Sequence, residues 1–585
     1  MWNTCTNAIS WLLLLTLCTT TRAFPVVKLM TYPSIAHQKT HTSLSLLRKK
    51  ERFFPLRGDG KATSLVVVSP SADGAIPFDS QNPSSSSGIH NETAIGVQST
   101  KEENGVPSPA SATRTTTTVT TAPTYREIFI FMSTTVLIWL SEPLLSLVDT
   151  TVVGLTQGGA AVTQLASLGP ATTLLDSLLY LTYFLSIATT NQIAASRAVG
   201  DVRQLQRTTS QTLGVATVLG SLTTATVWVW GRSWLTSMAG ASAATSGLVD
   251  YATSYACIRA AAAVPAVVGM VAQSVCLSTL DTKTPAIAVA VASVLNIVGD
   301  GLLAPTLGVR GAAFATAASN VASTAVLLRA VQKQMRKWRQ QEVASTAPNQ
   351  TTTPAPIPLI SWPDQKSLLD LLKLVGPIFF VICAKIACYS AMTLRCTDFG
   401  VLPLAAHGIM MRLWFFFGCF GDGLSQTAQS FLPGSLYPTP RPQQFRTLLV
   451  RLLVFAVGVG LMNSQLSNAI LQFGGSLFTN DSAILALMRD HRHYIGLGLL
   501  LHPLIMCLEG TVIAARDFST LVATYAVTLG LHFGILKWFS PDFSAVWRTF
   551  FLFQSIRLVN FAIHVWQKQR GNVKRERADA AAVTG

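Results

Sequence analysis

The chain has 585 residues, of which 49% are hydrophobic and only 12% are charged, and its mean hydropathy is +0.42. These values exclude an ordinary soluble globular protein and indicate an integral membrane protein in a lipid bilayer. The formal net charge of +16 does not indicate nucleic-acid binding, because the basic residues are concentrated in short stretches between apolar runs, where they set membrane orientation.

The first 23 residues have the composition of a secretory signal peptide. They contain an apolar stretch from Trp11 to Cys18 and end in Thr21-Arg22-Ala23, with small residues at the positions that a signal peptidase reads. The apolar stretch is too short to span a membrane. We therefore interpret residues 1–23 as a signal peptide.

Residues 24–125 are interpreted as a transit-peptide-like, disordered segment. The segment begins with Phe24-Pro25, is rich in Ser, Thr and basic residues, and has no acidic residue before Glu51. A signal peptide followed by such a segment resembles the bipartite plastid presequences of algae with secondary plastids, such as diatoms. We expect a plastid envelope or a related plastid membrane. The alternative is an ordinary signal peptide with a disordered lumenal arm, in an endomembrane or the plasma membrane.

Twelve apolar runs follow, and each is long enough to cross a bilayer as a helix. Six precede and six follow a basic, then Pro- and Thr-rich connector, which predicts an all-α integral membrane fold with twelve transmembrane helices in two six-helix lobes. We assign residues 126–340 to the N-lobe, 341–368 to a linker, 369–568 to the C-lobe and 569–585 to a basic tail. The spans are expected near 128–153, 169–195, 211–231, 255–278, 285–305, 310–331, 370–394, 403–430, 447–470, 494–515, 519–538 and 545–567.

The loop charges predict the orientation of these spans. If the first span starts inside, about 20 Lys and Arg residues of the loops and tail lie on that side, against about seven on the other. Both termini are therefore expected in the cytosol or stroma.

Asp149 is the most informative residue of the first span, because an ionisable group at that depth is costly without a partner or a function. Asn296 and Asp300 lie four residues apart in the fifth span (SVLNIVGD), so they share one face of a helix. A carboxylate and an amide on one face can bind a cation or accept a proton. The alternative for each acidic residue is structural, a buried hydrogen bond to a Ser, Thr or backbone group.

Several motifs together resemble MATE (multidrug and toxin extrusion) transporters. The first span ends in LVDTTVVG, with LASLG soon after, and the fifth span contains SVLNIVGD. Two C-lobe motifs, LSQTAQSF from Leu424 and LEGT from Leu508, are most similar to plant plastid-type proteins related to the DinF branch. The resemblance covers about Arg126 to Gln567.

This resemblance implies that Asp149, Asn296 and Asp300 line a cation or proton pocket in the N-lobe, with Thr316 as a fourth member. Glu142, seven residues before Asp149, returns to nearly the same helical face and would share or relay the proton. A neutral residue is usual at this position in the family, so Glu142 is a departure. Its alternative role is that of a Glu near the membrane interface, paired with Arg or Lys.

The predicted substrate-binding residues lie in the C-lobe, at Lys385, Arg412, Asp422 and Gln426. Lys385 stands in the seventh span, where one bacterial branch of the family carries a Glu. A cation there favours an anionic ligand or an internal carboxylate partner such as Asp422. Arg412 either helps Lys385 to attract an anion, pairs with Asp422 or extends toward the membrane interface. For two other acidic residues, Glu509 and Asp517, cap or loop roles are expected.

No catalytic or metal-binding motif is found in a suitable context, and the nine cysteines contain no CxxC. We therefore expect no enzyme and no cofactor, with H+ or Na+ as the coupling ion. The predicted function is a monomeric secondary antiporter that exports small organic solutes, either organic anions such as phenolic or carboxylic acids or xenobiotics. The alternatives are a lipid-linked precursor flippase of the same superfamily and a non-transporting membrane scaffold.

Overall fold

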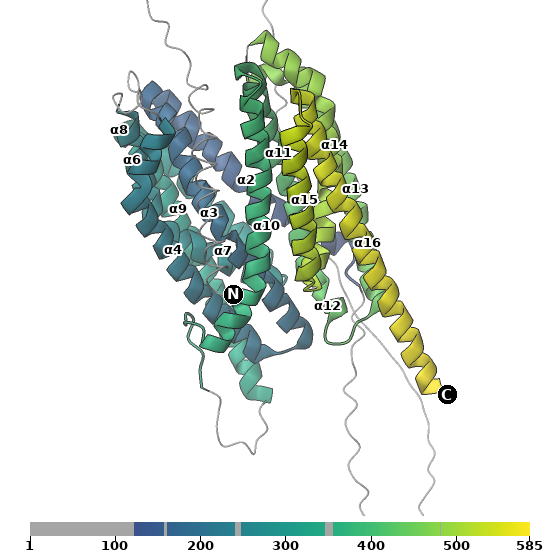
Figure 1. Ribbon diagram of the computed structural model, residues 1–585. Coiled ribbons are helices and arrows are strands. Elements are labelled where there is room, and N and C mark those ends of the chain that lie inside the picture. Colours follow the sequence, from purple (N-terminus) through teal and green to yellow (C-terminus); the bar gives the residue numbers. More distant parts are fainter. Residues whose placement is uncertain (1–121, 157–160, 240–246, 346–354, 480, 585) are drawn as a thin grey trace, which may run out of the picture. The chain divides into compact units, whose positions relative to one another are not determined.

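The computed structural model describes residues 122–156, 161–239, 247–345, 355–479 and 481–584. The predicted signal peptide and almost all of the predicted transit segment lie outside these residues, as does part of the predicted linker. The described residues form helices and no strands. Figure 1 shows them coloured along the sequence.

The helices of the first half are α2 (Tyr125–Thr156), α3 (Ala161–Val199), α4 (Val202–Ala239), α6 (Leu248–Ala261), α7 (Ala263–Ser278), α8 (Lys283–Leu307) and α9 (Val309–Ser345). Those of the second half are α10 (Gln365–Thr397), α11 (Val401–Phe431), α12 (Pro433–Leu436), α13 (Pro442–Phe473), the short 3-10 helix η3 (Gly475–Leu477), α14 (Ser482–Ala514), α15 (Phe518–Trp538) and α16 (Phe543–Thr584). Helices suit these apolar sequences, because a helix satisfies its own backbone hydrogen bonds in lipid.

The twelve-helix prediction is confirmed. Within the described residues, ten helices are long and apolar enough to cross a membrane, and α6 and α7 together form an eleventh, broken span with a bend of 48°. The twelfth predicted span corresponds to α16, whose mean hydropathy is lowered by polar residues such as Arg557 and Asn560. The break between α6 and α7 was not predicted, although Pro265 lies three residues after it and cannot continue the hydrogen-bond pattern of a helix.

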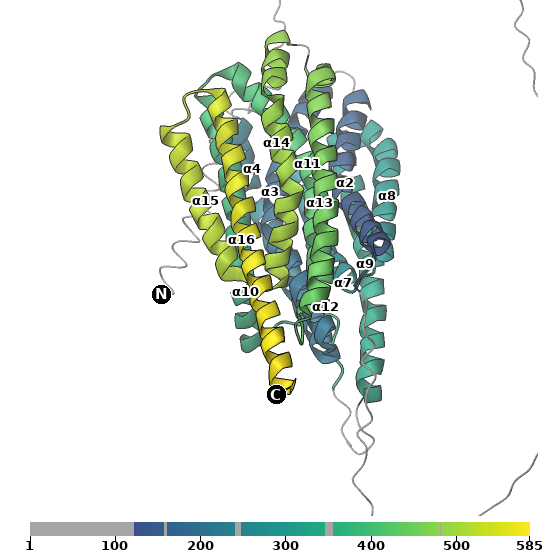
Figure 2. The same ribbon diagram turned by 90° about the vertical axis from the view of Figure 1, so that its right-hand side faces the viewer.

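The two lobes share α2 and α10 along their boundary. On α2, Ile128, Met132 and Val136 belong to the apolar core of the C-lobe helices. In return, Leu371 and Ile378 of α10 belong to an N-lobe core. Figure 1 shows α10 between the two groups of helices, and Figure 2 shows α2 beside α11. The first helix of each half therefore links the two lobes.

Close backbone approach holds α8 against α9 in the N-lobe. A Cβ atom at Gly299 would lie only 2.7 Å from Cβ of Ala315, and one at Gly311 only 2.3 Å from the carbonyl oxygen of Leu303. These glycines therefore allow the two helices to pack closely, as small residues commonly do in membranes. The contact sets the positions of the polar side chains on both helices.

Candidate functional site

The four residues predicted from the family resemblance meet in the N-lobe. Asp149 of α2 is 6% exposed, and Asn296 and Asp300 of α8 are completely buried. The hydroxyl of Thr316 on α9 donates to Oδ2 of Asp149 at 3.2 Å and accepts from Nδ2 of Asn296 at 3.2 Å. Three helices thus contribute to one polar cluster.

Several oxygens of this cluster are buried without a hydrogen bond to any described residue. They are Oδ1 of Asp149, Oδ1 of Asn296 and both carboxyl oxygens of Asp300. The carboxyl of Asp300 also lies close enough to that of Asp149 for the two to interact. Buried anionic oxygens without donors are costly, and two adjacent carboxylates resist simultaneous ionisation. The cluster is therefore chemically suited to hold a proton or a small cation.

Glu142 does not join this cluster. Its side chain is exposed, and its strongest electrostatic neighbours are Asp176 of α3 and Arg259 of α6. Neither neighbour was identified from the sequence, although Asp176 and Arg259 are each the single charged residue near the start of a predicted span. Glu142 thus belongs to a second charged group in the same lobe.

A pocket of about 50 Å³ lies between the lobes. Three of the four predicted substrate residues, Lys385, Asp422 and Gln426, are part of its wall, whereas Arg412 of α11 is exposed and is not part of it. The N-lobe supplies an aromatic wall in which Trp139 and Tyr183 make an edge-to-face contact at 5.0 Å. The lining is Trp139, Tyr180, Tyr183, Ile187, Ile378, Val381, Ile382, Lys385, Asp422, Ser425, Gln426, Gln429, Met506, Glu509, Ile513 and Leu521.

Lys385 has an internal partner, which is Glu509 rather than Asp422. Nζ of Lys385 lies 2.9 Å from Oε1 of Glu509, while Nη2 of Arg557 lies 2.7 Å from Oε2. The hydroxyl of Tyr525 donates to the same Oε2 at 2.6 Å. The expectation that Glu509 has a cap or loop role is wrong, because the helix continues past it and buries its side chain.

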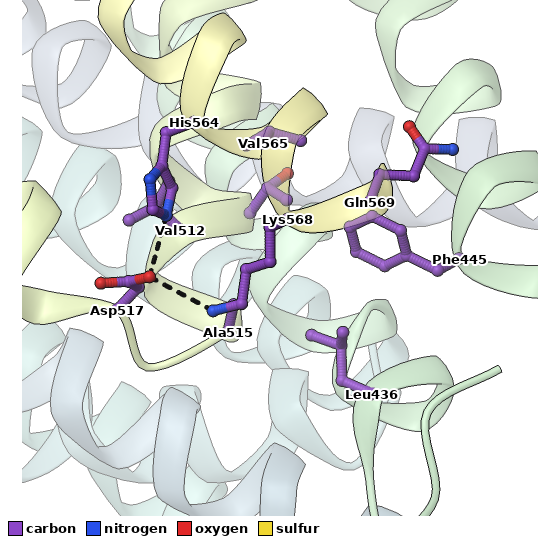
Figure 3. A pocket seen from close by; sticks show the side chains of 10 residues that line it. Leu436, Phe445, Val512, Ala515, Asp517, His564, Val565, Lys568 and Gln569 are labelled. Carbon is purple, nitrogen blue, oxygen red and sulfur yellow. Dashed lines mark hydrogen bonds and ion pairs between the residues drawn. The ribbon is translucent and has the colours of Figure 1, made fainter. Parts of the chain in front are cut away.

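Asp517 does have the expected loop role. It precedes α15, and its Oδ2 accepts from Nε2 of His564 at 2.8 Å and from Nζ of Lys568 at 3.3 Å (Figure 3). Burial alone would raise the pKa of the Asp517 carboxyl, but the Lys568 charge and the hydrogen bonds from Ser519, His564 and Lys568 lower it to about 2. This group fastens the turn between α14 and α15 to the end of α16.

Hydrogen bonds between the lobes close one end of the pocket. Nδ2 of Asn191 on α3 donates to the carbonyl oxygen of Ile513 at 2.5 Å, and Nε of Arg516 donates to Oδ1 of Asn191 at 3.0 Å. Nearby, Nε2 of Gln426 donates to the hydroxyl of Thr190 at 3.2 Å. The polar contacts therefore concentrate where α3 and α14 end.

The sequence matches the family model MatE over residues 135–302 and 377–536, which is more than half of the chain and includes both lobes. The chain belongs to the MATE family. Members of this family are membrane transporters rather than enzymes. The match confirms the resemblance inferred from the sequence motifs.

Relatives indicate a plant plastid-type MATE protein. Protein DETOXIFICATION 47, chloroplastic, from Arabidopsis thaliana is 33% identical over 399 residues, which cover 67% of this chain and 68% of that protein. Protein DETOXIFICATION 44, chloroplastic, from the same plant is 25% identical over 307 residues, or 52% and 54% of the two chains.

Solved structures support the fold. A multidrug resistance MATE transporter in an outward-facing conformation aligns with a TM-score of 0.63 at 16% identity, over 77% of this chain and 97% of that one. The Vibrio cholerae transporter VcmN in its bent form aligns with a TM-score of 0.61 at 16% identity, over 78% and 98%. The two-lobe MATE architecture is thus retained at low sequence identity.

Proposed function

We propose that this MATE protein is a proton-coupled antiporter that exports small aromatic organic acids. The carrying observation is the buried cluster of Asp149 and Asp300, whose oxygens lack donors among the described residues. Two interacting carboxylates readily share a proton. A Na+ ion would instead need these oxygens to rearrange into a shell around it, against the hydrogen bonds that Thr316 already makes.

The shared helix α2 connects the proton-binding cluster to the pocket. Asp149 lies in the part of α2 that contacts α8 and α9, whereas Val136 lies against Gly423 of α11, and Trp139 is part of the pocket wall. A proton on the cluster removes negative charge between α2 and α8 and changes their packing. Any resulting shift of α2 moves the aromatic wall, so protonation and solute binding favour different conformations.

The pocket favours an aromatic acid for two reasons. Trp139, Tyr180 and Tyr183 offer ring faces and edges, and Lys385 offers a cation to a carboxylate. The attraction is weaker than the sequence indicated, because Glu509 already pairs with Lys385. A proton on Asp422 would remove a negative charge near Lys385 and so strengthen the attraction of Lys385 for a solute carboxylate.

The test is transport of radiolabelled 4-hydroxybenzoate in proteoliposomes containing the full chain. Asp300→Asn should abolish transport driven by a pH gradient while the variant remains folded by circular dichroism. The matched control is Asp370→Asn, because Asp370 forms only an exposed pair with Lys373. Full activity of Asp300→Asn would remove the site assignment.

Changing the gradient and the solute tests the remaining parts of the proposal. Transport driven by a Na+ gradient at equal pH would identify Na+ as the coupling ion. Uptake of an organic cation in place of the acid would overturn the substrate class. Movement of a lipid-linked sugar would indicate a flippase, and absence of all transport would indicate a scaffold.

We infer a plastid membrane as the location, supported by the chloroplastic names of two relatives and by the predicted bipartite presequence. A fusion of residues 1–125 to a fluorescent protein should accumulate in plastids. Fluorescence confined to the secretory pathway would contradict this location.

A further inference from the structure

Two carboxylates extend the pocket wall of the N-lobe by one helical turn. Glu142 follows the pocket residue Trp139 by three positions on α2, and Asp176 precedes the pocket residue Tyr180 by four on α3. Residues at these spacings share a helical face. Because α2 and α3 are consecutive spans of opposite direction, both carboxylates lie on the side of the pocket toward the α2–α3 connection. The side chain of Asp176 is 51% exposed.

Arg259 of α6 holds this carboxylate group from behind. Its Nη1 lies 3.7 Å from Oδ1 of Asp176 and 3.4 Å from the hydroxyl of Tyr255, and only 12% of its side chain is exposed. Arg259 stands in the last turn of α6, just before the break at Ala262. A cation is favoured at the C-terminal end of a helix, so the break itself helps to keep a guanidinium at this depth.

Groups on three helices interact electrostatically with these side chains. From α2, Asp149 interacts with both Asp176 and Arg259. From α11, Cys419 faces Glu142, and from α6, Tyr255 faces Asp176 and Arg259. Asp176 therefore interacts electrostatically with both Glu142 and Asp149.

The charges of the two lobes differ. In the C-lobe network, Lys385 and Arg557 balance Asp422 and Glu509. In the N-lobe, four interacting carboxylates face one guanidinium, an excess of three negative charges if all are ionised. Such an excess at membrane depth requires bound protons or cations. The four carboxylates are those of Glu142, Asp149, Asp176 and Asp300. In the proposed antiport the Asp149–Asp300 pair shares one proton, which leaves an excess of one negative charge on Glu142 and Asp176 beside Arg259.

We propose that Glu142 and Asp176 form a second proton-binding site on the wall of the cleft, and that this site passes protons to Asp149. Arg259 is its positioning residue. Glu142 and Asp149 are about 10 Å apart along α2, which is too far for direct proton transfer. Asp176 interacts with both carboxylates and can connect them. With one proton at each site, the transporter exchanges two protons for each solute. This inference rests on the proposed proton-coupled antiport.

The number of protons is measurable from the pH gradient that balances a solute gradient. Proteoliposomes with the membrane potential held at zero are loaded with a tenfold gradient of 4-hydroxybenzoate, and the pH difference that stops net flux is found. One proton per solute requires about one pH unit, and two protons require about half a unit. The wild type should balance at about half a unit.

The double variant Glu142→Gln/Asp176→Asn should balance at about one unit. Solute counterflow at equal pH serves as the folding control, because exchange moves no net proton. A balance at one unit in the wild type, or at half a unit in the double variant, would overturn the second site while leaving the proposed antiport intact. If the net solute flux of the wild type does not depend on the pH difference, the proposed function is refuted, and this inference with it.

Arg259 is tested separately by its pH profile. Arg259→Gln removes the cation beside Asp176, so the carboxylates should hold protons at higher pH, and the profile of transport rate should move to higher pH by about one unit. Arg259→Lys should restore the profile in large part. An unchanged profile in Arg259→Gln would show that the arginine has only a structural role.

Discussion

Replacing Glu509 by Gln should destabilise the C-lobe strongly. The carboxylate of Glu509 pairs with Lys385 at 2.9 Å and with Arg557 at 2.7 Å, and it accepts from Tyr525 at 2.6 Å. Arg557 is not exposed at all and Lys385 only to 14%, so water cannot solvate Arg557 and solvates Lys385 only in part. Gln keeps one acceptor oxygen, so one side of the network loses its charge-assisted hydrogen bond, worth about 1.5–3 kcal/mol, and the negative charge is removed from both cations. We expect the free energy of unfolding to fall by about 3–5 kcal/mol, the usual cost of leaving a buried charge unpaired.

The assay is unfolding by sodium dodecyl sulfate in mixed micelles, followed by tryptophan fluorescence. Adding Lys385→Met to Glu509→Gln should recover part of the loss, because one of the two unpaired cations is then absent. Asp370→Asn, which removes only an exposed ion pair, should cost at most about 1 kcal/mol. A loss below about 1 kcal/mol in Glu509→Gln would refute the conclusion that this carboxylate holds the network together.

Two further predictions concern helix packing and the turn before α15. Gly299→Ala places a methyl group 2.7 Å from Cβ of Ala315 and should cost about 1–3 kcal/mol in the same assay, with recovery on adding Ala315→Gly; equal stability of the single variant would contradict the close α8–α9 contact. Asp517→Asn should cost about 1–2 kcal/mol at neutral pH. Burial raises the pKa of Asp517, but Lys568 and His564 lower it to about 2 in the folded chain, below about 3.9 when unfolded. The wild-type advantage should therefore be complete above about pH 4 and be lost as the pH falls toward 2; an advantage that does not change across that range would refute the pairing.

The sequence was sufficient for the spans because each membrane helix must carry its own apolar surface and satisfy its own backbone. It was also sufficient to bring Asn296 and Asp300 together, since their spacing puts them on one helical face. That Asp149 and Thr316 join them came from the family resemblance. The structure places all of these residues in one cluster.

The pairing of charges between distant helices could not be predicted in the same way. Glu509 lies near the end of its predicted span, which favoured a cap, but its partners Arg557 and Tyr525 come from two later helices. Arg557 was visible as a single cation in an apolar run, and the same signal marked Arg259 in the N-lobe. A charged residue in a span indicates that it has a partner, but only the three-dimensional structure identifies that partner.

The sharing of α2 between the lobes also has a consequence for the order in which the protein assembles. Among the described helices α2 comes first in the chain, and the helices that carry Asn296, Asp300 and Thr316 precede α11. Its apolar face, with Ile128 and Met132, can wait in contact with lipid, which solvates it as well as a protein neighbour does. Asp149, by contrast, carries an ionisable group whose exposure to lipid costs free energy. We therefore expect the polar N-lobe cluster to form before α2 packs against α11, so that the contact between the lobes forms last.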